Sequence, residues 1–90
     1  MGGGALRSPS PSIIEEILLI LDRRATLLEV VNRMTSLSPL SARTYIDFLL
    51  SRGLIEIKHD LPGDSVYGTT TRGREFLRDR ARAKLHLSAH

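Results

Sequence analysis

The feature that most limits the fold of this 90-residue chain is a change in the spacing of its apolar residues at Gly53. Before Gly53, apolar side chains recur every three or four residues, which is typical of amphipathic helices. Just after it, Ile55 and Ile57 alternate with charged residues, which indicates a half-buried β-strand. The segment 61–64, Leu-Pro-Gly-Asp, has Pro and Gly at the two central positions of a type II turn. We therefore expect helices followed by one β-hairpin over about residues 54–69.

Cap residues divide the part of the chain before the hairpin into three helices. Ser12 and Thr26 each stand three residues before a glutamate, the spacing of an N-terminal capping box. Ser38 precedes a proline, which is favoured at the first helical position. Gly53 follows the last apolar turn, where a left-handed residue commonly ends a helix. These signals predict helices over about residues 13–24, 27–35 and 39–52.

A fourth helix is expected after the hairpin, over about residues 72–87, with Thr70 or Thr71 as its N-cap. The chain begins with three glycines close to a Ser-Pro-Ser-Pro segment and has little to bury there, which predicts disorder. A chain of this length has room for one core, so we expect one mainly α domain with a small β-hairpin, an α+β fold. The expected parts are a disordered tail at 1–11, the domain at 12–87 and a short C-terminal tail at 88–90.

Composition excludes several classes of protein. The chain has no cysteine, which excludes a disulfide framework, a thiolate zinc site and a cysteine nucleophile. Its three histidines have no carboxylates at ligand spacing, and no serine or threonine has recognisable triad partners. The longest apolar run, 17–21, is far shorter than the roughly 18 residues that span a bilayer, and no signal peptide is evident. We expect a cytoplasmic protein that is not an enzyme, with no metal, cofactor, membrane contact or evident small-molecule site.

Positive charge is concentrated at the C-terminal end. The formal net charge is +3, and residues 70–90 contain six basic and two acidic side chains. Residues 1–37 sum to zero. A basic segment can mark a nucleic-acid contact, but the same pattern also occurs on a solvated helix face. Both interpretations remain open from the sequence.

The order helix, helix, helix, hairpin, helix predicts a winged helix-turn-helix. Two segments resemble signatures of archaeal winged-helix DNA-binding proteins: 45–56, YIDFLLSRGLIE, and 67–77, YGTTTRGREFL. The resemblance covers roughly residues 13–85, although the family usually has Leu where this chain has Thr69. It implies a small transcriptional regulator or chromatin-associated protein that binds double-stranded DNA. The alternative is a winged helix used for protein–protein contact or dimerisation without DNA binding.

In such a protein the third helix, about 39–52, would enter the major groove. Arg43 is the one long donor on its expected outward face, able to bond a guanine or a phosphate. Leu40 could contact a thymine methyl group or pack against Leu37 across the turn. Positive charge on the wing comes from two residues, although nearby aspartates offset it. The expected DNA-binding residues are Ser38, Leu40, Ser41, Arg43, Thr44, Lys58, His59, Arg72 and Arg74.

Surplus apolar residues on the first and last helices favour a homodimer. Leu19 falls outside the main apolar stripe of its helix, and the last helix has more apolar side chains than one small core requires. Small domains gain from added burial, and two recognition helices about 34 Å apart can enter successive major grooves. The alternative is that Leu19 is a lone exposed apolar residue. The expected interface residues are Leu19, Phe76, Leu77, Ala81 and Leu85.

Overall fold

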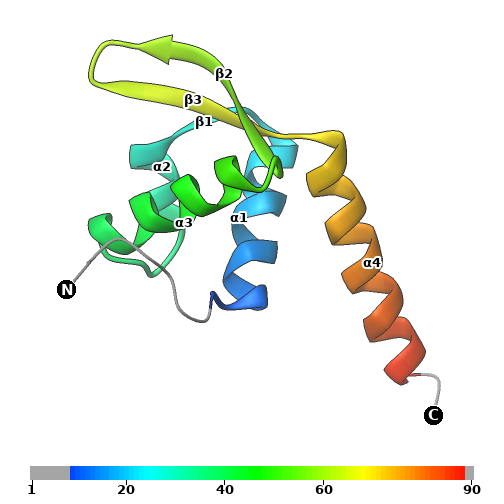
Figure 1. Ribbon diagram of the computed structural model, residues 1–90. Coiled ribbons are helices and arrows are strands. Elements are labelled where there is room, and N and C mark those ends of the chain that lie inside the picture. The colour runs from blue at the N-terminus through cyan, green and yellow to red at the C-terminus, as the bar shows by residue number, and fades with distance from the viewer. Residues whose placement is uncertain (1–8, 89–90) are drawn as a thin grey trace.

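The computed structural model describes residues 9–88, with side chains through residue 85. Four helices and a three-stranded antiparallel sheet of order β1-β3-β2 make up this described part of the chain (Figure 1). The elements are α1 (Pro11–Arg23), β1 (Thr26–Leu27), α2 (Leu28–Met34), α3 (Pro39–Ser51), β2 (Ile55–Leu61), β3 (Asp64–Thr69) and α4 (Thr71–Ser88). The predicted winged-helix fold is confirmed: α2 and α3 form the helix-turn-helix, and β2–β3 forms the wing.

The hydrophobic core lies among α1, α2, α3 and the base of the sheet. Ile17, Leu18, Val31, Ile46 and Leu49 are fully buried in it. Each such side chain stabilises the fold by about 1.5–3 kcal/mol relative to remaining exposed. This core fixes α3 against α1, while the wing extends away from the body of the molecule (Figure 1).

The third helix is confirmed almost as predicted. The Ser38 side chain caps α3 by accepting a hydrogen bond from the Ser41 backbone N–H, over 3.2 Å. At the other end Gly53 has φ of 70°, the left-handed conformation that glycine adopts without steric cost. The cap and the terminal glycine therefore fix both ends of this helix.

The first helix begins earlier than predicted. Its N-cap is Ser10, whose hydroxyl accepts from the Ile13 N–H, and Pro11 occupies the first turn. The Ser10 N–H also donates to the Tyr45 hydroxyl at 2.9 Å, which ties this end to α3. The predicted capping box at Ser12 is therefore wrong, as is the end of the predicted tail at residue 11. The rest of that tail, residues 1–8, lies outside the described residues.

The segment before α2 differs from the prediction because it forms a strand. Thr26 and Leu27 pair with Tyr67 and Val66 of β3, so α2 begins at Leu28. The Thr26 hydroxyl donates to the Arg24 carbonyl and does not cap the helix. A two-residue strand leaves no alternating pattern, so periodicity could not have found it.

The last helix is capped by Thr70, which decides between the two candidates. The Thr70 hydroxyl accepts from the Gly73 N–H and donates to the Gly53 carbonyl at 2.7 Å. The neighbouring Thr69 is buried, and its hydroxyl donates to the carbonyl of Leu18. A hydrogen bond thus anchors the end of β3 to α1 at the position where the resembled family usually has an apolar residue. Ser88, predicted to begin the C-terminal tail, is the last residue of α4, and residues 89–90 lie outside the described part.

The wing contains a β-bulge. Ile57 pairs with Tyr67 and His59 pairs with Val66, which leaves Lys58 as the extra residue on β2. Such an insertion increases local twist and reverses the alternation of faces beyond it. Ile55 is buried, but Ile57 is 48% exposed, so the prediction of a half-buried strand is wrong beyond the first residue.

Candidate DNA-binding surface

The N-terminal half of α3 presents an exposed surface, as the sequence predicted. Leu40 is 71% exposed, and Ser38 and Ser41 are joined by a hydroxyl–hydroxyl hydrogen bond of 3.0 Å. The Thr44 hydroxyl donates to the Leu40 carbonyl at 2.8 Å. Its proton is therefore occupied, which leaves Thr44 able to accept a hydrogen bond from a ligand. Leu40 is not buried against Leu37, because most of its side chain is exposed to solvent.

Arg43 is the strongest candidate for an anion contact on this helix. Its Nε lies 3.7 Å from Asp47 Oδ1, and both side chains are about two-thirds exposed. An exposed pair of this kind contributes between zero and about 1 kcal/mol. Arg43 can consequently exchange Asp47 for a phosphate or a base edge at small cost.

A hollow of about 500 Å³ lies between α2, α3 and the wing. Arg43 lines it from α3, Asn32 from α2, and Asp60 and Ser65 from the wing. The fold thus brings the predicted α3 contact beside the wing. Asn32 was not predicted; its Oδ1 is buried and has no hydrogen-bond partner among the described residues. The only sequence signal for Asn32 is that it is the one asparagine in the chain.

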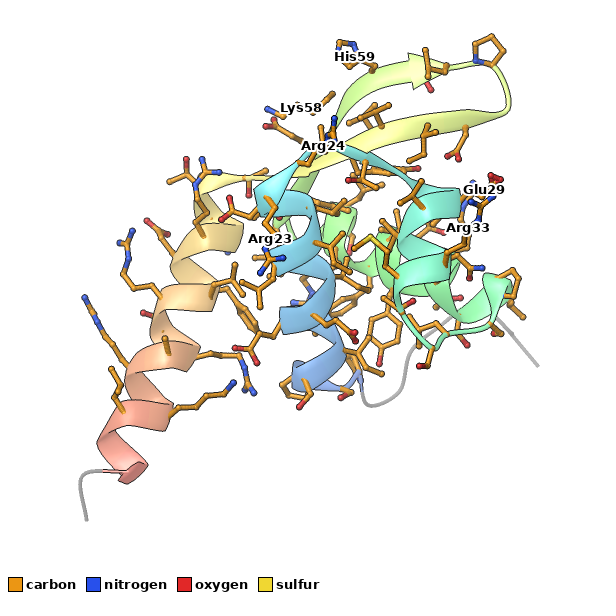
Figure 2. All side chains as sticks on the ribbon, turned by 180° about the vertical axis from the view of Figure 1, so that it is seen from behind. Arg23, Arg24, Glu29, Arg33, Lys58 and His59 are labelled. Atoms are coloured by element: carbon orange, nitrogen blue, oxygen red, sulfur yellow. The ribbon has the colours of Figure 1, made fainter. Side chains whose placement is uncertain are left out.

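The wing contributes less positive charge than its sequence indicates. Figure 2 shows Lys58 and His59 on the hairpin, where both residues are exposed. The Lys58 Nζ lies 2.9 Å from Glu56 Oε2, so an adjacent carboxylate offsets its charge. The aliphatic part of Lys58 covers Gly68. His59 and Lys58 remain predicted DNA contacts.

Half of the basic residues of the C-terminal segment bind α1. Arg74 Nη1 lies 3.2 Å from Asp22 Oδ1 and also donates to the Thr69 carbonyl. Lys84 Nζ lies 2.9 Å and Arg80 Nε 3.5 Å from the Glu15 carboxylate. Arg74 thus contacts α1 and is about half exposed, whereas Arg72 is exposed at the start of α4. Both remain predicted DNA contacts.

Glu15 is the group whose ionisation responds most clearly to these contacts. The hydrogen bond from Lys84, together with the positive charges of Lys84 and Arg80, lowers the pKa of the Glu15 carboxyl. Burial acts in the opposite direction and is the weaker effect. The charged carboxylate is therefore stabilised where α4 runs alongside α1 (Figure 2).

The expected dimer residues separate into two groups. Phe76 and Leu77 are half-buried and pack against the core, so part of each side chain already covers the core of its own chain. Ala81 is exposed, as are Leu85 at 72% and Leu19 at 47%. All five remain predicted interface residues.

Within residues 9–88, no group of three or more His, Asp or Glu side chains could hold a metal ion. No helix in the same range is long and apolar enough to cross a membrane.

The helix-turn-helix, the wing and the exposed α3 surface define the domain as a winged helix-turn-helix. It is similar to the zinc-responsive MarR family member ZitR of Lactococcus lactis, with a TM-score of 0.70 and 17% identity over 99% of this chain. A cysteine-to-serine mutant of ZitR matches with a TM-score of 0.69 and 17% identity, and a glutamate-to-alanine mutant with 0.69 and 15%. At these identities the likeness establishes the fold.

The chain spans 64% of the length of ZitR, and 64% and 63% of the two mutant chains. No family model and no curated protein matches the sequence.

Proposed function

We propose that this protein binds double-stranded DNA and acts as a small transcriptional regulator, with the N-terminal half of α3 in the major groove. The observation that supports this most strongly is the exposed Arg43 beside the wing, on the helix that winged-helix proteins use to contact bases. The proposed contacts on α3 are Ser38, Leu40, Ser41, Arg43 and Thr44; those outside it are Lys58, His59, Arg72 and Arg74.

Structural likeness to ZitR, a zinc-responsive MarR family member, supports the proposal at the level of the fold. The resemblance to archaeal winged-helix proteins and the homodimer remain predictions. In this proposal α3 contacts the bases. The wing and the start of α4 contact the DNA backbone, and such contacts position the domain without specifying sequence.

A second candidate is a protein–protein interaction module. The pairing of Arg74, Arg80 and Lys84 with α1 favours it, because these cations stabilise the fold and are less accessible to phosphate. A largely apolar groove lined by residues of α1, β1 and α2, away from α3, favours it as well.

The deciding experiment is a titration of a fluorescently labelled random-sequence duplex, followed by anisotropy at several salt concentrations. DNA binding predicts that the logarithm of the association constant falls linearly with the logarithm of salt, by about 0.9 per phosphate neutralised. The same titration with the corresponding single strand is the control for non-specific charge attraction. An absence of binding to duplex at low salt would contradict the proposal and favour the interaction module.

A further inference from the structure

The exposed face of α3 carries two opposite charges on neighbouring turns. Leu40, Arg43, Thr44 and Asp47 have the i, i+3, i+4, i+7 spacing of a single helical face. The Thr44 hydroxyl proton is occupied by the Leu40 carbonyl. The charged groups of this face are the Arg43 guanidinium, which can only donate hydrogen bonds, and the Asp47 carboxylate, which can only accept them.

The pairing of Arg43 with Asp47 leaves most of both groups available to a ligand. Arg43 Nε lies 3.7 Å from Asp47 Oδ1, an ion pair that is longer than a hydrogen bond, and the two side chains are 63% and 64% exposed. Within residues 9–88, neither side chain has another ion pair or hydrogen bond. The two terminal nitrogens of the guanidinium and the second carboxylate oxygen can therefore meet a ligand.

The order of these two charges along α3 argues against a purely structural role. A helix is stabilised more when the acidic residue precedes the basic one by four positions, as Glu29 precedes Arg33 in the exposed pair on α2 (Figure 2). In α3 the basic residue comes first, so the same spacing stabilises the helix less. Helix stability thus gives little reason for a carboxylate at Asp47, and the ligand of α3 gives a better one.

The major-groove edge of a G·C base pair complements these two groups. Guanine presents two adjacent acceptors, N7 and O6, which match the fork of arginine nitrogens, whereas adenine presents one acceptor. The N4 amino group of the paired cytosine presents a donor beside them. Arg43 next to Asp47 offers donors and then an acceptor, which is the complementary order. A thymine would instead place its O4 acceptor against the carboxylate.

We propose that Asp47 is a specificity-determining residue that accepts a hydrogen bond from cytosine N4 while Arg43 binds the paired guanine. The inference rests on the proposed DNA-binding function and names the DNA that α3 selects, namely sites with a G·C pair at this contact. Where no cytosine faces it, the Asp47 carboxylate meets only acceptors and phosphates, and like charges repel. Asp47 therefore lowers the affinity for other sequences, and this repulsion adds to the specificity.

Selection of bound duplexes from a random pool, followed by anisotropy titration of the full chain, tests the proposal. The selected sites should contain a constant G·C pair, and exchanging it for A·T should weaken wild-type binding at least about tenfold. In Asp47→Ala, the ratio of the affinity for the selected site to that for random duplex should fall at least about tenfold. Thermal unfolding of this variant should match wild type, because the side chain is exposed.

Glu29→Ala is the matched control, because it removes the acidic member of the comparable exposed pair on α2. It lowers the negative charge of the protein by the same amount as Asp47→Ala. The ratio of the two affinities should stay at its wild-type value.

Small chemical changes in the selected DNA assign the two contacts. In 7-deazaguanine the N7 acceptor is replaced by a C–H group, which should weaken binding by wild type and Asp47→Ala but not by Arg43→Ala. In N4-methylcytosine a methyl group replaces the amino hydrogen that faces the major groove, while the base pair is retained. This change should weaken binding by wild type and Arg43→Ala but not by Asp47→Ala.

Equal sensitivity of wild type and Asp47→Ala to N4-methylcytosine would overturn the role of Asp47. Salt-dependent binding of duplex without any preference for a G·C pair would refute this inference and leave the proposed function in place. A protein that binds no duplex at low salt would refute the proposed function, and this inference with it.

Discussion

The carboxylate of Asp64, at the start of β3, accepts a hydrogen bond of 3.3 Å from the backbone N–H of Leu28, the first residue of α2. Its second oxygen accepts from the Glu29 N–H, also at 3.3 Å. The residue at the N-cap position, Leu27, has no side chain that could do this. A residue of the wing therefore caps the first helix of the helix-turn-helix, and its negative charge lies at the positive end of the helix dipole.

Replacing Asp64 with Ala should destabilise the protein by about 1 kcal/mol, within the range of 0.5–2 kcal/mol typical of a lost N-cap. Asp64→Asn retains an acceptor and should cost less. Urea unfolding at neutral pH measures both. Asp60→Ala is the control, because Asp60 is a neighbouring wing aspartate that accepts only an exposed bond from the Ser65 hydroxyl; equal losses at the two positions would contradict the capping role.

Gly73→Ala should destabilise the protein by more than about 1 kcal/mol, although alanine is the better helix former. A Cβ at this position would collide with the backbone carbonyl oxygen of Leu54 and lie 2.6 Å from Thr69 Cγ2. Gly68→Ala is the matched control, since its Cβ would meet only the flexible side chain of Lys58. Its stability change should stay within about 0.5 kcal/mol. Thermal unfolding measures the stability of both variants. A Gly73→Ala protein as stable as wild type would refute the close approach of Gly73 to the Leu54 carbonyl.

Glu15→Gln should reduce stability at pH 7 by about 1 kcal/mol, since it removes the carboxylate that pairs with Lys84 and Arg80. Because the pKa of Glu15 is lowered in the folded protein, its contribution is complete above the usual value of 4.5. It disappears as the pH falls through the lower folded value. The difference between wild type and variant should therefore shrink in acid, as measured by urea unfolding across pH.

Glu75→Gln controls for the loss of one negative charge on the exposed side of α4. It should leave the acid dependence of stability close to that of wild type. A Glu15→Gln protein that keeps the full wild-type acid dependence would show that the α1–α4 ion pairs do not stabilise the fold.

Arg43→Ala should weaken duplex binding by about 1–3 kcal/mol if the guanidinium contacts a base, with stability unchanged because the side chain is exposed. Asp47→Asn should strengthen binding, because it removes the negative charge next to Arg43. The anisotropy titration with duplex measures both variants. Arg82→Ala removes an equal charge from α4 and is the control; an equal effect at the two positions would mean that only net charge matters.

The sequence predicted several features that depend on local chemistry, although the capping boxes at Ser12 and Thr26 were wrong. Ser38 and Gly53 each act within a few residues of their own position in capping or ending a helix, so their roles followed from spacing alone. Spacing narrowed the cap of α4 to Thr70 or Thr71, and the structure shows Thr70. The exposure of Arg43 followed from helical periodicity in the same way.

Features that depend on distant partners could not be predicted. The Asp64 cap joins residues 36 positions apart, and the two-residue β1 exists because β3 lies beside it. Arg74 pairs with Asp22 because α4 packs on α1. A count of charges along the chain does not describe that packing. Phe76 appeared to exceed what the core requires because the sequence does not show that it packs against that core.

The bulge at Lys58 divides the wing into a base and an outer hairpin whose directions can differ. The base of the hairpin is fixed to the core by the Thr69 and Thr70 hydrogen bonds, whereas the outer hairpin begins only after the unpaired residue. Loss of that one residue would leave the β2–β3 residue pairs intact while straightening the hairpin, since a bulge is what bends it. The direction in which the wing tip reaches is therefore adjustable by a single-codon insertion or deletion, with no change to the core that supports α3.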